Sequence, residues 1–452
     1  MTNVIKLSKG LDIRLKGRAA EQKIQLKSNG KFALVPDDFE GVTPKVVVRE
    51  GDTVRAGDPL FVNKQYPEVA FASPVSGKVT AVRRGERRRV LAVEVTADAQ
   101  QQYVDFGRQD LAKMDGQAVV DLLLKAGLFG YINQLPYAIS ALPPQWDNGQ
   151  GKPKAIFVSA LRDMPLACDF DYEVKGQEAD FQAGLSALAK IATTHLGIRP
   201  GSPLEAMKDV TVTAYDGPCP AGNASVQVNH TDPVNKGETV WTVEPTAVLF
   251  IGRLICSGHV DLRRTIALCG SEVTKPIHAD MLVGEELSTL VANSYDATHH
   301  VRIINGNVLT GRPTTKEGFL GAHTSEITII PEGDDAAEFA GWIMPRFQQF
   351  STNRSYFSWL FGKKEYALDA RIKGGKRNMI MSGEYDRVLP MDIYGEYLIK
   401  AIIAGDIDKM EQLGIYEVSP EDFALAEFVC SSKLELQHIV REGLNMLRKE
   451  NA

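Results

Sequence analysis

An aromatic loop holds the residues whose types best suit a ligand. The loop combines three aromatic residues within nine positions, a glycine and two side-chain amides; these six are Phe129, Gly130, Tyr131, Asn133, Gln134 and Tyr137. It lies between a helix-like stretch and an α/β pattern, and ligand pockets are common at such junctions. Aromatic rings would pack against a flat apolar ligand, while hydroxyl and amide groups would donate hydrogen bonds to it. The alternative is a packed connector that binds nothing.

The cysteines and histidines lack the spacing of metal ligands. The five cysteines are Cys168, Cys219, Cys256, Cys269 and Cys430, never closer than 13 residues and without a CxxC pair. This pattern argues against a disulfide framework, a structural zinc and an iron–sulfur cluster, and it favours reduced, mostly buried thiols. The histidines that invite a metal interpretation are His278, His299, His300 and His323, and they match no ligand pattern either.

The α/β pattern lacks a phosphate-binding loop. After the first strand-like run, residues 159–165 read SALRDMP, with no GxGxxG motif. After the second run, residues 216–223 read DGPCPAGN. This turn would supply backbone donors at a helix start, but Pro218 and Pro220 have no N–H group. We therefore expect a Rossmann-like layer without a nucleotide. Residues 257–259 (SGH) also lack the glycine and strand of a nucleophile elbow.

An N-terminal stretch resembles a biotinyl/lipoyl-type barrel. Residues 50–79 run from the turn EGDTVRAGDPL through a hairpin to SPVSGKV. Carrier domains present a lysine at the hairpin tip, whereas here Tyr66 holds that place and Lys64 lies two residues away. We expect a structural barrel without a prosthetic group. Residues 83–89 (RRGERRR) form a basic turn, either a solvated hairpin or a docking point for an acidic partner loop or anionic lipid.

Length and composition indicate a folded multidomain protein. The chain has 452 residues, 44% hydrophobic and 24% charged, which suggests about three or four domains. A net charge of −6 argues against nucleic acid as a partner. The sequence lacks a signal peptide pattern and a run of about 20 apolar residues. Any contact with a membrane is therefore expected to go through partner proteins.

The pattern of elements predicts an α/β multidomain fold with four domains. Residues 1–105 read as the barrel domain, 106–265 as a Rossmann-like α/β domain, 266–335 as a β-grasp (SLBB-like) domain, and 336–452 as a C-terminal helical domain. Periodicity predicts helices at 110–130, 178–193, 240–256, 280–292, 397–403, 423–429 and 434–449. Strands are expected at 155–160, 210–215, 266–269, 301–304 and 326–330.

Short motifs along nearly the whole chain resemble one family. They are IKLSKGLD at 5–12, GPCPAGN at 217–223, DPVNKG at 232–237, IGRL at 251–254, IINGNVLTG at 303–311, VCSSK at 429–433 and VREGL at 440–444. With these motifs the chain resembles the A subunits of the sodium-translocating NADH:quinone oxidoreductases, the Nqr complexes.

The resemblance implies a complex that couples electron transfer from NADH to ubiquinone to Na⁺ export. It implies a peripheral protein on the cytoplasmic face of the bacterial inner membrane, with no catalysis by the isolated chain. The partners would be the B to F subunits of the Nqr complex, chiefly the B subunit in the membrane. Those partners would carry the FAD, FMN, riboflavin and iron–sulfur centres.

The resemblance also implies that this chain binds ubiquinone, partly through residues 129–137. In the family this segment is more basic, with Arg and Lys flanking the proline, so this chain departs from the pattern there. The main alternative is a scaffold role without quinone contact. The missing CxxCxxC argues against an Rnf-type electron carrier, and the missing glycine loop argues against a nucleotide-dependent dehydrogenase.

Overall fold

The N-terminal barrel consists of two facing sheets. In the computed structural model, which describes residues 2–147, 149, 151–334, 343–352 and 354–451, the strand orders are β3-β9-β8-β5 and β4-β6-β7. The strands are β3 (Lys31–Leu34), β4 (Pro44–Val46), β5 (Thr53–Val54), β6 (Pro59–Asn63), β7 (Ala70–Ala72), β8 (Gly77–Arg84) and β9 (Val90–Ala97). Leu60, Phe61, Phe71 and Val93 of these strands are buried. The expected barrel is therefore confirmed.

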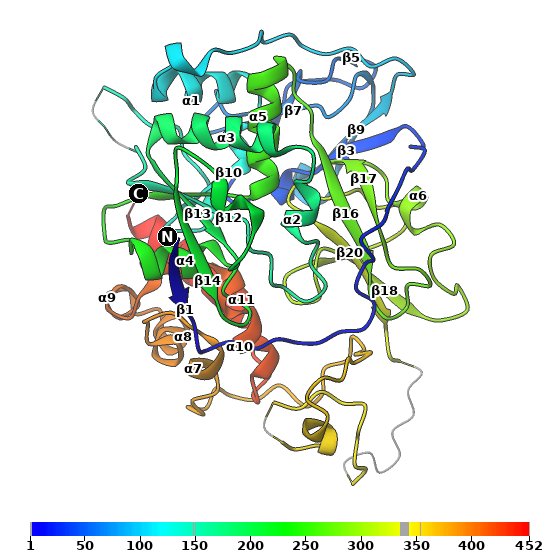
Figure 1. Ribbon diagram of the computed structural model, residues 1–452, viewed down its shortest axis with the longest axis vertical. Helices are drawn as coiled ribbons and strands as arrows, with labels where there is room; N and C mark the ends of the chain where they lie inside the picture. The colour runs from blue at the N-terminus through cyan, green and yellow to red at the C-terminus, as the bar shows by residue number, and fades with distance from the viewer. Residues whose placement is uncertain (1, 148, 150, 335–342, 353, 452) are drawn as a thin grey trace.

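The second domain is built on a seven-stranded, mostly parallel sheet of order β1-β14-β13-β12-β15-β10-β11. Its strands are β1 (Asn3–Lys6), β10 (Ile132–Leu135), β11 (Ile139–Ser140), β12 (Ala155–Ser159), β13 (Thr193–Ile198), β14 (Thr211–Asp216) and β15 (Val240–Val243). Three helices, α1 (Gly116–Lys125), α3 (Glu178–Ile191) and α5 (Pro245–Ser257), pack side by side (Figure 1). Helix α4 (Ala224–Thr231) packs against β12.

The start of the chain pairs with two sheets outside the barrel. Strand β1 pairs in parallel with β14 of the α/β sheet, and β2 (Lys23–Ile24) pairs with β17 of the third domain. The chain between them crosses the molecule as an extended segment (Figure 1). Residues 3–24 therefore connect the sheet of the α/β domain with the sheet of the third domain.

The third domain contains a six-stranded sheet of order β19-β18-β20-β16-β17-β2. Its further strands are β16 (Arg263–Cys269), β17 (Ile277–Leu282), β18 (Val301–Asn305), β19 (Arg312–Thr314) and β20 (Glu326–Pro331). The helix expected at 280–292 is wrong in its first half, because residues 280–282 belong to β17 and only the short α6 (Ser288–Val291) is helical. In β17, Asp280 faces out and Met281 faces in, which is the alternation of a strand.

The helix expected at 240–256 is also divided. Residues 240–243 form β15, and α5 begins only at Pro245. A proline fits the first turn of a helix but disfavours helical backbone in the residue before it. Glu244 is accordingly extended, with φ −60° and ψ 142°.

The C-terminal domain is helical, as expected. Its helices are α7 (Tyr385–Val388), α8 (Gly395–Ala404), α9 (Ile407–Gln412), α10 (Ala424–Val429) and α11 (Leu436–Glu450). The boundary expected near residues 335 and 336 lies outside the described residues. Within the described residues, no helix combines the length and the apolar content that crossing a bilayer requires.

Candidate ligand cavity

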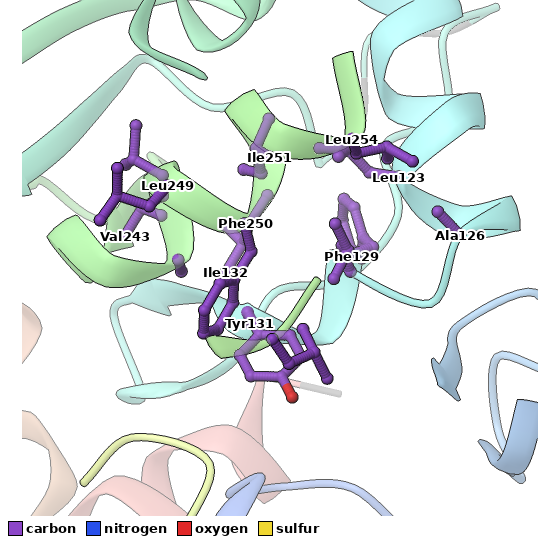
Figure 2. Close-up of a cluster of buried hydrophobic side chains, with 14 of the residues drawn as sticks. Leu123, Ala126, Phe129, Tyr131, Ile132, Val243, Leu249, Phe250, Ile251 and Leu254 are labelled. Carbon is purple, nitrogen blue, oxygen red and sulfur yellow. The ribbon is translucent and has the colours of Figure 1, made fainter. Parts of the chain in front are cut away.

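The start of the aromatic loop belongs to the hydrophobic core. Phe129 is fully buried, and its ring meets Trp241 edge-on with 5.4 Å between ring centres. Figure 2 shows Phe129 among side chains of α1 and α5. A side chain at Gly130 would collide with the ring of Phe71 at 2.2 Å. These two residues therefore join the barrel to the α/β domain and leave no surface for a ligand.

Tyr131 is buried but carries a hydroxyl group without a hydrogen-bond partner among the described residues. Its ring lies 5.3 Å from Phe39, 5.6 Å from Phe250 and 5.7 Å from His323, measured between ring centres. In Figure 2 the oxygen points away from the apolar cluster. Burial raises the pKa of this hydroxyl group, so it stays a neutral donor at physiological pH.

The other three candidates lie in different surroundings. Asn133 is half-buried and lines a cavity. Gln134 is buried, and its amide oxygen accepts a 2.9 Å hydrogen bond from the N–H of Leu142. Tyr137 lies against α11, where Arg441 donates a 2.8 Å hydrogen bond to its carbonyl oxygen. The six residues therefore do not form one pocket, and of the six only Asn133 lines the cavity.

The cavity that Asn133 lines has a volume of about 410 Å³ and lies where the domains meet. It opens at the carboxyl ends of β12 and β15, neighbouring parallel strands. In the sheet, β13 lies next to β12 on one side, and β15 lies next to β12 on the opposite side. This is a topological switch point, where open α/β sheets bind ligands. The barrel contributes Asp38, the third domain contributes residues 305–307 and His323, and the C-terminal domain contributes Glu421.

Two helices and a buried ion network surround the cavity. Helices α4 and α5 begin at its wall, with Asn223 and Glu244 as the residues before their first turns. Glu244 lies 3.4 Å from His323 and 3.8 Å from Arg264. Burial alone would raise the pKa of Glu244, but Arg264, a hydrogen bond with His323, and Arg162 hold it below its ordinary value. The carboxylate therefore stays ionised beside the imidazole ring of His323.

Other acidic groups in the cavity hold their protons more tightly. Glu421 is exposed where it lines the cavity, but the surrounding protein limits its hydration, and this desolvation together with Asp422, Glu244 and Asp163 raises its pKa to about 8. At neutral pH this carboxyl group is a hydrogen-bond donor. Burial raises the pKa of Asp163 to about 6, although the N–H of Gly222 donates to it at 2.8 Å. The cavity thus offers both donors and acceptors.

Comparison with known proteins shows one family over the full length. Residues 5–98 match the NqrA N-terminal barrel-sandwich hybrid domain, 114–260 the NqrA second alpha/beta domain, and 265–316 the NQRA C-terminal domain. The chain is 32% identical to the A subunit of the Na(+)-translocating NADH-quinone reductase of Yersinia pestis (bv. Antiqua, strain Angola), over 99% of this chain and 100% of that protein. The chain belongs to the NqrA family.

Other NqrA relatives match to a similar degree. The corresponding proteins of Neisseria meningitidis serogroup B and Serratia proteamaculans, which bear the same name, are 32% and 33% identical, each over 99% of this chain and 100% of the relative. A chain of a crystallised NAD⁺-reducing [NiFe]-hydrogenase covers 77% of this chain at 13% identity, with 67% of its own length aligned. The TM-score of 0.35 is too low for that likeness to carry an argument.

The aromatic-loop hypothesis does not include several residues that line the cavity of this NqrA chain. Asp163 and Glu244 follow β12 and β15 closely, so the rule about strand ends would have found them. Glu421 gives no such signal, because only the tertiary fold brings it to the sheet. His323 was grouped with His299 and His300, but the latter two pair with Glu272 and Asp334. Within the described residues, no three potential metal ligands converge.

The remaining candidates from the sequence, which are Tyr66, the basic turn and the cysteines, lie outside the cavity. Tyr66 lies in the turn between β6 and β7, where its carbonyl oxygen accepts a 2.9 Å hydrogen bond from Val69. In the basic turn, Arg83 pairs with Glu94, and Arg89 pairs with Asp37 at 2.7 Å. All five cysteines are free thiols, four of them buried and Cys256 exposed.

Proposed function

We propose that this chain works as the A subunit of a Na⁺-translocating NADH-quinone reductase, as a peripheral component without a redox centre of its own. The end-to-end similarity to relatives of that name supports the proposal. The chain sits on the cytoplasmic face of the inner membrane, held by the B to F subunits and chiefly by the B subunit in the membrane. The flavins and iron–sulfur centres belong to those partners.

We further propose that the cavity at the switch point receives the head group of ubiquinone. A quinone head group is a flat ring with two carbonyl acceptors, so it requires donors and a ring-shaped wall. Asn133 and the protonated Glu421 supply donors. The His323 ring, which lies against Tyr131 and Phe39, supplies the wall. A volume of about 410 Å³ lies in the range of small-molecule sites.

Within this proposal, the six sequence candidates have different roles. Asn133 contacts the ligand, and the ring of Tyr131 supports His323 from the side away from the cavity. Phe129 and Gly130 fix the position of the loop through the core. Gln134 and Tyr137 hold the following strand and turn through their hydrogen bonds.

A scaffold role without quinone contact is the second candidate. The observation that favours it is the charge of the cavity, since Asp38, Asp163, Glu244, Glu326 and Glu421 all line it. A wall so rich in carboxyl groups is unusual for a hydrophobic ligand, whose sites are mostly apolar with few polar groups.

A quinone titration distinguishes the two roles. The intact chain is titrated with a short-tailed ubiquinone, and binding is followed by quenching of tryptophan fluorescence. Replacing Asn133 by leucine removes one donor and lowers the affinity about five- to tenfold. Replacing the exposed Gln65, on the barrel hairpin, leaves the affinity unchanged. Saturable binding that is identical in all three proteins would place the quinone elsewhere, and no binding would favour the scaffold.

A further inference from the structure

Residues 343–381, here called the basic aromatic segment, contrast in charge with the rest of the chain. The segment holds eight lysines and arginines against two acidic residues, Glu365 and Asp369, although the chain as a whole has a net charge of −6. Apart from Phe357–Leu360, a short 3₁₀ helix, its described part has little regular structure. Figure 1 shows it extending from the body of the molecule, beyond the third domain and the C-terminal helices.

The segment also exposes large apolar side chains. Ten of the seventeen large apolar side chains exposed among the described residues belong to it. These ten are 41–66% exposed: Ile343, Met344, Phe347, Phe357, Trp359, Leu360, Phe361, Ile372, Ile380 and Met381. Monomeric soluble proteins rarely expose apolar side chains in such a concentration, so a partner surface is expected to cover them.

Aromatic and cationic groups alternate on this surface. Phe347 packs against Phe357 and Phe361, with ring centres 6.2 and 6.0 Å apart. Lys364 lies 5.7 Å from the ring centre of Phe361, and Arg354 lies 5.0 Å from that of Trp359. Aromatic rings with adjacent Lys and Arg suit the boundary between lipid head groups and acyl chains.

A second cavity, of about 550 Å³, lies between the segment and the C-terminal helices. Its wall combines apolar groups such as Ile372 and Leu434 with five cations. Three of these cations have acidic partners: Arg371 and Lys373 pair with Asp369, and Lys376 pairs with Glu435.

The other two cations of this wall are Arg377 and Lys433. Their side chains have no ion-pair partner in the described part of the chain, although Glu384 and Glu427 also line the cavity. Glu427 is engaged with the N–H of Gln437 at 2.9 Å, and Glu384 with that of Ser431 at 3.2 Å. The two free cations are therefore available to an external anion.

We propose that the basic aromatic segment and this cavity bind anionic phospholipid, so that the chain contacts the bilayer surface directly. The phosphate group faces Arg377 and Lys433, and the apolar side chains enter the head-group boundary. A membrane protein is a poorer occupant, because cytoplasmic loops are themselves rich in Lys and Arg and would repel this surface. Anionic head groups attract it. The proposal rests on the proposed function only in placing the chain beside a membrane, and it adds a lipid contact to attachment through partners.

Vesicle flotation of the full-length chain tests the proposal. We expect the chain to float with vesicles of phosphatidylcholine and phosphatidylglycerol at 3:1, but not with phosphatidylcholine alone. High salt releases it, since the attraction is electrostatic. No flotation with the anionic vesicles, or equal flotation with both, overturns the proposal; the latter result would assign the surface to nonspecific apolar contact. If millimolar glycerol 3-phosphate or inorganic phosphate displaces the chain completely, the site binds a free anion rather than a lipid.

Paired variants assign the contact to the segment. R377Q/K433Q lowers the vesicle affinity by about fivefold per cation removed, roughly 25-fold together. W359S/F361S, which removes two exposed rings, weakens binding while leaving the segment soluble. The matched control K45Q/R49Q removes two exposed cations of the barrel and retains full affinity. An equal loss of vesicle affinity in the control would mean that only the net charge of the chain matters, and it would overturn the assignment of the contact to this segment. Quinone titration of the same variants is unchanged, so failure here is separable from failure of the proposed quinone site.

Discussion

At the scale of single residues, Tyr131 combines a buried ring with an unpaired hydroxyl group. It is 3% exposed, and its hydroxyl group has no partner among the described residues. A buried polar group without a hydrogen bond costs about 1–3 kcal/mol. The fold tolerates that cost directly behind His323, a residue that lines the cavity.

Replacing Tyr131 by phenylalanine therefore has two opposite effects. It raises the free energy of unfolding by about 1 kcal/mol, because the unpaired hydroxyl group is removed while the ring packing stays. It also weakens ubiquinone binding, but less than Asn133→Leu does, because Tyr131 lies behind His323 and does not itself line the cavity. Urea denaturation and the fluorescence titration measure the two effects.

Tyr215 is the matched control for this experiment. It is equally buried, but its hydroxyl group is 2.6 Å from that of Thr231 and donates to the carbonyl oxygen of Gln227 at 3.3 Å. Tyr215→Phe breaks these bonds and lowers stability. A Tyr131→Phe variant that is as unstable as Tyr215→Phe would mean that the Tyr131 hydroxyl group has an undetected partner.

Glu421 makes stability depend on pH. Its pKa is raised to about 8 in the folded chain by burial and by the neighbouring carboxyl groups, against an ordinary value of 4.5. Between those two values the folded chain holds a proton that the unfolded chain has lost. The contribution is complete below pH 4.5 and is lost as the pH rises through 8.

The variant Glu421→Gln should remove this part of the pH dependence. Urea midpoints measured at pH 5.5, 7.0 and 8.5 fall with pH in the parent and fall less steeply in the variant. Parallel curves for the two proteins would show that Glu421 titrates normally in the folded chain.

At the scale of elements, helices α3 and α5 approach each other closely. A side chain at Gly252 would reach within 1.7 Å of the carbonyl oxygen of Asp180, and one at Gly184 within 2.2 Å of that of Val248. Glycine lowers helix stability by about 1 kcal/mol relative to alanine, so its presence here reflects the contact. The contact holds α5, whose first turn lies at the cavity.

Gly252→Ala accordingly destabilises the chain, by about 1–3 kcal/mol net of the gain in helix propensity. Thermal unfolding of the full chain measures it. The control Gly375→Ala, at a position with no neighbouring atom within 4 Å, is neutral. If Gly252→Ala is also neutral, the two helices have room to separate.

The elements that the sequence predicts best are those with strong local patterns. The runs at 155–160 and 301–304 form β12 and β18, and the periodicity at 434–449 corresponds to α11. The sequence pattern does not separate β15 from α5 at Glu244, because apolar residues continue on both sides of that position. Pro245 is the residue that marks the start of the helix. The cavity itself was not predictable, since Asp38, Glu421 and His323 meet only through packing between domains.

At the scale of the whole molecule, one buried carboxyl group joins the C-terminal helices to the α/β domain. Asp422 accepts hydrogen bonds from Asn223 at 2.8 Å and Ser225 at 2.6 Å, and from the N–H of Ser419 at 2.7 Å. Asn223 precedes α4, so this junction also shapes the cavity wall.

Asp422→Ala leaves these donors unsatisfied and costs about 3 kcal/mol. We expect faster hydrogen exchange in α10 and α11 and earlier tryptic cleavage at the junction. The control Asp408→Ala, an exposed position on α9, changes neither. Uniformly faster exchange throughout the chain would instead indicate a single cooperative unit.

The pairing of β1 with β14 has a consequence for synthesis on the ribosome. The strand at residues 3–6 leaves the exit tunnel more than 200 residues before its partner at 211–216. At about 5–20 residues per second, it waits on the order of 10–40 s. During that interval its apolar positions, including Val4 and Ile5, have no sheet to join, so a nascent chain stalled before residue 211 should recruit chaperones through this strand.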